Sequence, residues 1–263
     1  MTYQRKEVIG DCTLYQGDCL EVMTTLGEFD AVVTDPPYCS GARTSADVAG
    51  RGGMSRGQRW KAKPITNDRM TVTGFTWLLR HVAEACYTML PEGGSFVSFI
   101  DWRQYPTLYG VVESVNFRVQ NVAVWDKEDM ALGNGFRNQH EFAIHAAKGV
   151  PLIYDRGTPN VLRVKRISSS DLHPTEKPAE LLRRLVSVVS PIGGSVLDPF
   201  MGSGTTGVAC VNLGRKFTGI ELDPGYFDVA CRRIEEAYKQ PRLFEEPAPK
   251  PVQERISFDG DAA

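Results

Sequence analysis

The fold is decided by the stretch Val196-Leu197-Asp198-Pro199-Phe200-Met201-Gly202-Ser203-Gly204-Thr205-Thr206. It contains a short apolar run, a turn with two glycines and the start of a helical pattern. Gly202 and Gly204 let the backbone approach a ligand closely, and the first turn of a helix offers free amide groups. A strand, a glycine turn and a helix in this order are typical of Rossmann-like nucleotide sites.

A carboxylate follows this turn at a suitable spacing. Glu221 comes 23 residues after Asp198, at the end of the next apolar run, where it can accept both hydroxyl groups of a ribose. A dinucleotide site needs a third glycine, for which Gly207 is the candidate. Asp198 would also repel a pyrophosphate and attract an ammonium group. S-adenosylmethionine carries an ammonium, a sulfonium and a ribose diol, so it is favoured over NAD.

Strand and helix patterns alternate along the chain. Apolar runs predict seven strands, over Cys12–Gly17, Ala31–Thr34, Ser95–Ile100, Gln120–Trp125, Glu141–Ala146, Ser195–Leu197 and Phe217–Glu221. Helices are predicted over Phe75–Leu90, Tyr105–Val115, Ala179–Ser190, Thr205–Leu213 and Tyr226–Tyr238. This alternation predicts an α/β fold: a doubly wound, mostly parallel sheet with helices on both faces.

The composition excludes several classes of protein. The 263 residues are 42% hydrophobic and 24% charged, which is typical of a globular chain rather than a disordered or fibrous one. No apolar run approaches the roughly 18 residues of a membrane span, and the polar start of the chain predicts no secretory leader. Six scattered cysteines without a CxxC pair predict neither disulfides nor a zinc site and favour a cytoplasmic location.

Basic residues are concentrated in two places. Residues 41–70 hold seven basic and two acidic side chains, although the whole chain has a net charge of -2. The basic residues of interest there are Arg43, Arg51, Arg56, Arg59, Lys61 and Lys63, and a second cluster contains Arg163, Lys165 and Arg166. Such charge is explained equally well by a solvated surface and by contact with phosphates. The choice between these two interpretations depends on which part of the fold the basic segment follows.

A second motif stands near the start of the chain. Asp35-Pro36-Pro37-Tyr38 directly follows the apolar run Ala31–Thr34. Two successive prolines exclude a helix interior or a central strand, so the motif is a rigid turn at the carboxyl end of a strand. Open α/β sheets bind their ligands at such ends. A mere strand terminator would need neither the acid nor the tyrosine, so a functional turn is favoured.

These motifs together carry a family resemblance. Three segments resemble those of the S-adenosylmethionine-dependent DNA amino-methyltransferases. They are Asp35-Pro36-Pro37-Tyr38, named here the catalytic turn, Asp198–Thr205, named the glycine turn, and His173-Pro174-Thr175-Glu176-Lys177-Pro178. The order of the motifs is similar to that of the circularly permuted β group. The resemblance extends from about Leu14 to Tyr238 and implies a seven-stranded methyltransferase sheet, with duplex DNA as the partner. A second copy of the chain and a cognate restriction enzyme are partners that it leaves open, as it leaves open a bacterial or a phage origin.

The resemblance also implies how the chain is organised. Residues 1–239 form a single methyltransferase domain, and a tail rich in proline and charge follows over 240–263. The parts of the domain are a catalytic half at about 12–149 with a basic insertion at 39–70, a recognition segment at about 150–172, and a cofactor-binding half at about 173–239. Because the recognition segment is short, recognition of the target is expected to be shared with the insertion.

The resemblance gives roles to the catalytic residues Asp35, Pro36, Pro37 and Tyr38. The target base is flipped out of the duplex, and Tyr38 stacks on it. Asp35 and the carbonyl group of Pro36 accept the two hydrogens of its exocyclic amine, with Pro37 completing the rigid turn. The lone pair of that amine is delocalised into the ring, so two acceptors are needed to stabilise the positive charge that develops as the methyl group arrives.

Further residues are expected to hold the cofactor. They are Asp18, Asp35, Lys177, Asp198, Phe200, Gly202, Ser203, Gly204, Thr205, Glu221 and Leu222. Lys177 is expected at the methionine end. Asp18 has two interpretations that stay open, a place near the adenine of the cofactor or an N-cap for a helical run from Leu20. No metal is expected, and His140 and His145 are interpreted as residues of the fold.

The position of the basic insertion now favours contact with DNA. It follows the catalytic turn directly, so its six basic residues are expected beside the flipped base, with Arg163, Lys165 and Arg166 as further phosphate contacts. Members of the resembled family that act on N4 of cytosine more often carry Ser at the first position of the turn. The resemblance therefore implies N6 of adenine as the target of this chain, which has Asp35 there, and N4 of cytosine is the alternative. A non-catalytic DNA-binding subunit should have lost one of the motifs, and a dinucleotide oxidoreductase should bind nicotinamide.

Overall fold

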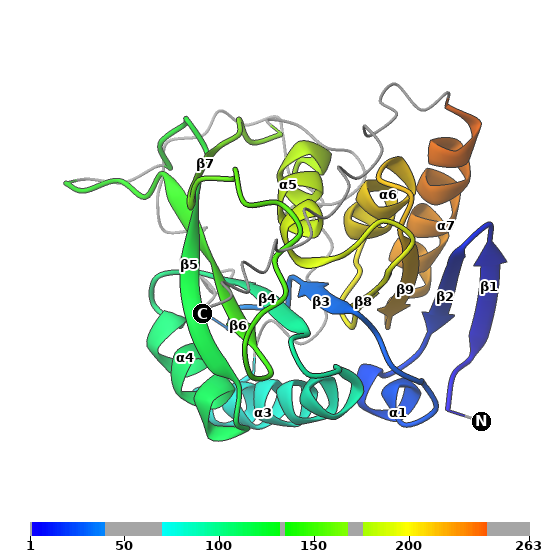
Figure 1. Cartoon of the computed structure of the whole chain (residues 1–263), viewed down its shortest axis with the longest axis horizontal. Coiled ribbons are helices and arrows are strands. Elements are labelled where there is room, and N and C mark those ends of the chain that lie inside the picture. The colour runs from blue at the N-terminus through cyan, green and yellow to red at the C-terminus, as the bar shows by residue number, and fades with distance from the viewer. Residues whose placement is uncertain (1, 40–69, 132–134, 168–175, 241–263) are drawn as a thin grey trace, which may run out of the picture.

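The computed structural model describes residues 2–39, 70–131, 135–167 and 176–240. These residues form one sheet with helices on both faces (Figure 1). The strands are β1 (Arg5–Ile9), β2 (Cys12–Gln16), β3 (Ala31–Thr34), β4 (Ser95–Ile100), β5 (Arg118–Asp126), β6 (His140–Ala147), β7 (Val161–Arg163), β8 (Ser195–Asp198) and β9 (Lys216–Glu221). The helices are α1 (Cys19–Met23), α3 (Val72–Met89), α4 (Tyr105–Ser114), α5 (Ala179–Val189), α6 (Thr205–Asn212) and α7 (Pro224–Lys239).

The strands follow the order β1-β2-β9-β8-β3-β4-β6-β5-β7. Five central neighbours, from β2 to β4, run parallel, whereas β1 pairs antiparallel with β2 and β6 pairs antiparallel with β4 and β5. The predicted α/β fold with a mostly parallel sheet is confirmed. The five predicted helices are present, and their ends differ from the predicted ones by at most three residues.

The predicted number of strands was too small, because the described residues form nine and not seven. β1 is an edge strand of sequence RKEVI with mostly exposed side chains, so it lacks the apolar run that marks a buried strand. β7 has three residues and lies in the segment 150–172, where no periodicity was visible; it pairs with β5 and buries Leu162. Both were missed because short or exposed edge strands bury too few side chains to leave a pattern.

The helices form two layers, which places a binding crevice between two central strands. In Figure 1, α1, α3 and α4 cover one face of the sheet, and α5, α6 and α7 cover the other. The chain leaves β3 for α3 on one face and leaves β8 for α6 on the opposite face. Because β3 and β8 are neighbours, the winding changes direction between them, and open α/β sheets bind ligands at such a point.

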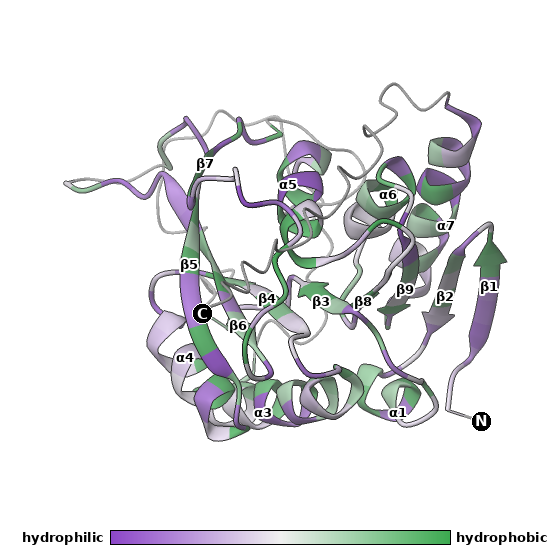
Figure 2. Ribbon diagram, viewed as in Figure 1, coloured by the Kyte–Doolittle hydropathy of each residue, from purple (hydrophilic) through white to green (hydrophobic). Residues whose placement is uncertain are grey.

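Each helix buries one apolar side. In α5, Leu181, Leu182, Leu185, Val186 and Val189 recur at helical spacing and are buried. The hydropathy colouring in Figure 2 shows the contrast between such buried faces and the polar outer faces. No helix in the described part of the chain combines the length and the apolar character that a bilayer crossing requires.

Candidate active site

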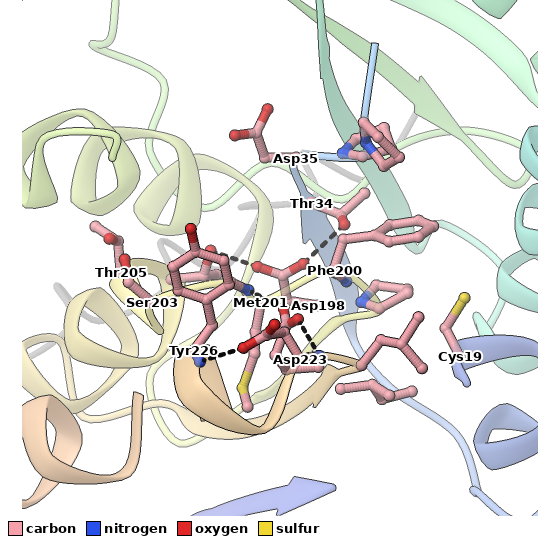
Figure 3. Close-up of a pocket in the computed structure, with 18 of the residues that line it drawn as sticks. Cys19, Thr34, Asp35, Asp198, Phe200, Met201, Ser203, Thr205, Asp223 and Tyr226 are labelled. Carbon is pink, nitrogen blue, oxygen red and sulfur yellow. Dashed lines mark hydrogen bonds between the residues drawn. The ribbon is translucent and has the colours of Figure 1, made fainter. Parts of the chain in front are cut away.

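A cavity of about 370 Å³ opens at the carboxyl ends of β2, β9, β8 and β3. It brings the catalytic turn and the glycine turn, which are more than 160 residues apart in the sequence, into one pocket (Figure 3). The predicted site residues that line it are Asp18, Asp35, Pro36, Pro37, Tyr38, Lys177, Asp198, Phe200, Gly202, Ser203, Thr205, Glu221 and Leu222. The two motifs therefore meet at the change of winding direction, although no local pattern in the sequence joins them.

Asp198 ties the two turns together. Its Oδ1 accepts a hydrogen bond from Thr34 Oγ1 at 2.7 Å, and its Oδ2 accepts one from Thr206 Oγ1 at 2.7 Å. The backbone amide of Phe200 is a third donor, at 3.0 Å. Burial raises the pKa of Asp198 to about 6, against the effect of these hydrogen bonds. The carboxylate of Asp198 thus accepts hydrogen bonds from three groups of the chain itself, and the attraction of an ammonium group to it stays a prediction.

The two glycines of the turn have different tasks. Gly204 has φ +79°, and a Cβ atom there would lie 2.9 Å from the Cβ atom of Ala230 in α7. It is the N-cap of α6 and is not among the residues that line the cavity. Gly202 does line the cavity, and its amide donates to Glu221 at 2.9 Å. Gly204 therefore allows close helix packing, while Gly202 shapes the pocket wall.

Glu221 presents a carboxylate at the end of β9. One oxygen accepts from the amide of Gly202, and the other accepts from the amide of Asp223 at 2.7 Å. Burial raises the pKa of Glu221 to about 7, against the effect of these two amides. Each oxygen keeps a further lone pair, so the carboxylate can accept a diol.

Asp18 shows the capping contact that the sequence offered as one alternative. Its side chain accepts from the amide of Leu20 at 2.8 Å and caps α1. It also lines the cavity. The N-cap interpretation is confirmed by this geometry, and a contact with a cofactor adenine stays a prediction.

The catalytic turn carries its own hydrogen-bond network. Oδ1 of Asp35 accepts from the hydroxyl group of Tyr38 at 2.7 Å, and Oδ2 contacts Nζ of Lys177 at 2.5 Å. Burial raises the pKa of Asp35, against the attraction of Lys177. Burial would lower the pKa of Lys177, but the two carboxylates beside it outweigh that effect and raise it. The structure thus places the Lys177 ammonium at the catalytic turn.

One residue of this network was missed from the sequence. Glu141 on β6 accepts from the Tyr38 hydroxyl at 3.0 Å and pairs with Lys177 at 3.3 Å. Its other oxygen pairs with Lys127. Burial would raise the pKa of Glu141, but the two ammonium groups lower it below its ordinary value. The signal in the sequence was an acid at the start of a predicted apolar strand, in the run Glu141–Ala146.

A second cavity of about 250 Å³ lies beside Tyr38 and Glu141, which line both cavities. Its other residues are Asp101, Trp102, Lys127, Asp129, Ala131, Asn138, His140 and Arg166. Trp102 is half exposed, so its ring is accessible. This second cavity offers an aromatic surface and several hydrogen-bonding groups next to the catalytic turn.

The predicted DNA contacts are only partly visible. Arg166 lines the second cavity and pairs with Asp129 at 2.7 Å. Arg163 and Lys165 are exposed near it, and Arg163 lies 3.9 Å from Asp126. The remaining six, Arg43, Arg51, Arg56, Arg59, Lys61 and Lys63, lie outside the described residues, as does His173.

Among the described residues, no group of three or more His, Cys, Asp or Glu side chains could hold a metal ion. His145 donates to or accepts from Ser95 Oγ at 3.1 Å, and burial lowers its pKa. His140 packs its ring on Phe142, with 4.9 Å between the ring centroids.

The sequence of the chain matches a family of DNA methylases. A family model described as DNA methylase, N6_N4_Mtase, matches residues 29–232. The YubD protein of Escherichia coli (strain K12), whose name describes a methylase, is 32% identical over 221 residues, covering 83% of this chain and 88% of YubD. The type II methyltransferase M.HinfI of Haemophilus influenzae is 27% identical, covering 91% of this chain and 73% of that protein.

Solved structures agree with these relatives. The crystal structure of the M1.HpyAVI–SAM complex has a TM-score of 0.66 and 26% identity, covering 85% of this chain and 98% of that one. The PvuII DNA methyltransferase, which is cytosine-N4-specific, shares the fold with a TM-score of 0.70 at 16% identity, covering 90% of this chain and 95% of that one.

Proposed function

The chain belongs to the N6/N4 family of DNA methylases, and from that premise we propose that it methylates N6 of an adenine turned out of duplex DNA. It is a DNA methyltransferase whose methyl donor is S-adenosylmethionine. The choice of adenine rests on one observation, which is Asp rather than Ser at the first position of the catalytic turn. N4 of cytosine is the alternative, because the cytosine-N4-specific PvuII enzyme has the same fold.

The larger cavity suits S-adenosylmethionine. Glu221 supplies the acceptor that a ribose diol needs, and Phe200, Ile220 and Leu222 supply an apolar wall for an adenine ring. Asp18 and Ser203 add polar groups to the lining of the cavity. The bound donor supplies a methyl group on a sulfonium, which leaves as a neutral thioether. The proposed cofactor residues are thus grouped around the end of β9 and the glycine turn.

Asp35 and the Pro36 carbonyl group are the proposed acceptors of the target amine. In this structure Tyr38 and Lys177 each contact one oxygen of Asp35. In the proposed mechanism the arriving amine takes the place of the Tyr38 hydroxyl at Oδ1, and the hydroxyl keeps Glu141 as its acceptor. The released ring can then stack on the base. The lone pair of the amine forms the N–C bond while the C–S bond breaks with its electrons on sulfur, and the extra proton then leaves nitrogen. The two acceptors hold the nitrogen in line and stabilise its charge.

The second cavity is the proposed place for the flipped base. It shares Tyr38 and Glu141 with the larger cavity and is lined by none of the glycine-turn residues. Trp102, Asn138 and His140 give it aromatic and polar groups. Arg163, Lys165, Arg166 and the six basic residues of 41–63 are the proposed phosphate contacts. We retain one domain over 1–239, with recognition shared between 39–70 and 150–172, and a tail over 240–263.

The decisive experiment expresses the chain in a host without DNA methylation and sequences the DNA by a method that detects modified bases. N6-methyladenine in one sequence context is the expected product, and N4-methylcytosine would establish the alternative. An Asp35→Ala variant should bind S-adenosylmethionine and leave the DNA unmodified. A matched control, Glu84→Gln on the exposed side of α3, should retain activity. Unmodified DNA from the unaltered chain would refute the proposal.

A salt titration tests the basic insertion. Neutralising Arg51, Arg56, Arg59 and Lys61 should weaken DNA binding and reduce the slope of log K against log salt by roughly 3 to 4, because each phosphate contact contributes about 0.9. An unchanged affinity and slope would show that these charges are ordinary solvated surface.

A further inference from the structure

The catalytic turn is surrounded by four charged groups that the preceding mechanism does not fully use. Asp35 and Glu141 are the two carboxylates, and Lys177 and Lys127 are the two ammonium groups. Lys177 touches both carboxylates and is only 6% exposed. Buried charges need partners. The Asp35 carboxylate, however, attracts a second cation less strongly when the Lys177 ammonium is beside it.

We propose that Glu141 is a positioning residue for methyl transfer, which compensates the charge of Lys177 and holds the Tyr38 hydroxyl so that Asp35 can stabilise the cationic amine. The proposal rests on the methyltransferase function given above. Glu141 itself is not assigned a contact with the reacting atoms. It acts through the two groups that occupy Asp35.

The charge argument follows from the count of groups around Asp35. With Glu141 present, the two carboxylates balance Lys177 and Lys127. Without it, a net charge of about +1 remains within a few ångströms of the nitrogen that becomes positive, and in a water-poor pocket such repulsion is strong. The transition state then loses more than the ground state, because the amine is neutral before the methyl group arrives. The loss should therefore appear in kcat and not in cofactor binding.

The hydrogen-bond argument concerns Tyr38. Its hydroxyl group has one hydrogen but lies within hydrogen-bond distance of both Asp35, at 2.7 Å, and Glu141, at 3.0 Å. When the target amine takes the Asp35 oxygen, the hydroxyl still has Glu141 as acceptor. A partly buried hydroxyl left without a partner would destabilise this arrangement. Glu141 thereby lets Tyr38 release Asp35 without losing its anchor.

A purely structural role for Glu141, as a buried ion pair between β6 and Lys127, makes a different prediction. The groups that face Asp35 are Tyr38 on its own turn, Lys177 before α5, Glu141 on β6 and Asp198 on β8, and Lys127 after β5 faces Glu141. Of these, Glu141 raises the pKa of Asp35 by repulsion. Removing its charge must lower that pKa. Because burial also raises the pKa of Asp35, Glu141→Asp, which keeps the charge and alters the packing, is the control for a change in burial.

The test compares Glu141→Gln with the unaltered chain and with the Glu84→Gln control. DNA from a methylation-deficient host is the substrate, and kcat is measured from pH 5 to 9. We expect kcat to fall at least about tenfold, the KM for S-adenosylmethionine to stay within about twofold, and the acid limb of the kcat profile to move to lower pH. An unchanged kcat, or a lower kcat with an unmoved acid limb, would overturn the proposal.

Two additions keep the result interpretable. Glu141→Asp retains the charge, so it should keep the acid limb in place and recover part of the rate even if Glu141→Gln is poorly folded. In a Lys177→Met background, Glu141→Gln should lower kcat by a far smaller factor than it does alone, because the Lys177 ammonium that Glu141 compensates is absent. Equal costs in both backgrounds would contradict the assigned role.

A readout that needs no activity separates this proposal from the function on which it rests. The carboxyl group of Asp35 can be titrated by NMR in carbon-13-labelled protein, with Asp35→Asn to assign its signal. A lower pKa in Glu141→Gln is expected, and an equal pKa would refute the coupling. If the unaltered chain methylates no DNA, the proposed function fails while this titration still decides the coupling.

Discussion

Glu221 should make cofactor binding depend on pH around neutrality. Its carboxyl group has a pKa raised by burial to about 7 in this structure, so the group changes from mostly protonated to mostly ionised as the pH rises from 6 to 8. A ribose diol donates hydrogen bonds to the ionised form. If only that form binds, the ionised fraction rises from about 1/11 to about 10/11, and the affinity for S-adenosylmethionine should rise about tenfold.

Isothermal titration calorimetry at pH 6, 7 and 8 measures this effect, with Glu221→Gln as the reference. The amino group of the ligand also titrates near this range, and it affects both proteins equally. The ratio of the two dissociation constants, variant over unaltered chain, therefore isolates Glu221. Asp198 has a pKa of about 6 but gives its oxygens to Thr34, Thr206 and Phe200, and it is present in both proteins. A ratio that stays constant from pH 6 to 8 would refute the assignment of Glu221 to the diol.

Two further variants test the turns. Asp35→Asn keeps the shape of the catalytic turn but removes its charge, so single-turnover methylation should slow by about 10²–10³-fold while the calorimetric affinity for S-adenosylmethionine stays the same; a comparable rate would exclude Asp35 as the acceptor. Gly204→Ala should lower the free energy of unfolding in urea by at least about 1–2 kcal/mol, because Gly204 has φ +79° and a Cβ atom would lie 2.9 Å from that of Ala230. Gly110→Ala, on the exposed side of α4 with no atom near its Cβ position, should instead stabilise by about 1 kcal/mol.

The order of elements was predictable because each leaves a strong local signal. The buried strand β3, which pairs parallel on both sides, begins with the apolar run Ala31-Val32-Val33, and α5 shows helical spacing of its leucines and valines. The turns were predictable for a different reason, since Asp35-Pro36-Pro37-Tyr38 and the glycine turn contain residues that a simple loop would not need. Such motifs reveal which residues are special and leave their spatial partners unspecified.

The rest of the site depends on contacts between distant segments. Glu141 precedes an ordinary apolar run, and nothing near it in the sequence indicates Tyr38 or Lys177. Its role follows only from the sheet order, which places β6 beside β4 and near β3. The same reason explains Lys177, whose expected place was the methionine end and whose ammonium lies beside Asp35. A lysine carries its charge at the end of a long flexible side chain, so a motif position alone leaves the location of that charge open.

The permuted order of the motifs has a simple structural consequence. The catalytic turn comes first in the chain and the glycine turn comes last, yet β3 and β8 pair directly, with Ala31 opposite Val196. The Thr34–Asp198 hydrogen bond of 2.7 Å then links the last residues of these two strands. The distance between the proposed acceptor of the amine and the proposed cofactor turn is thus set by neighbouring strands of one sheet, and it does not depend on how the chain connects them. A permutation that keeps this strand pair keeps the geometry of methyl transfer, whereas an insertion between the pair would abolish it.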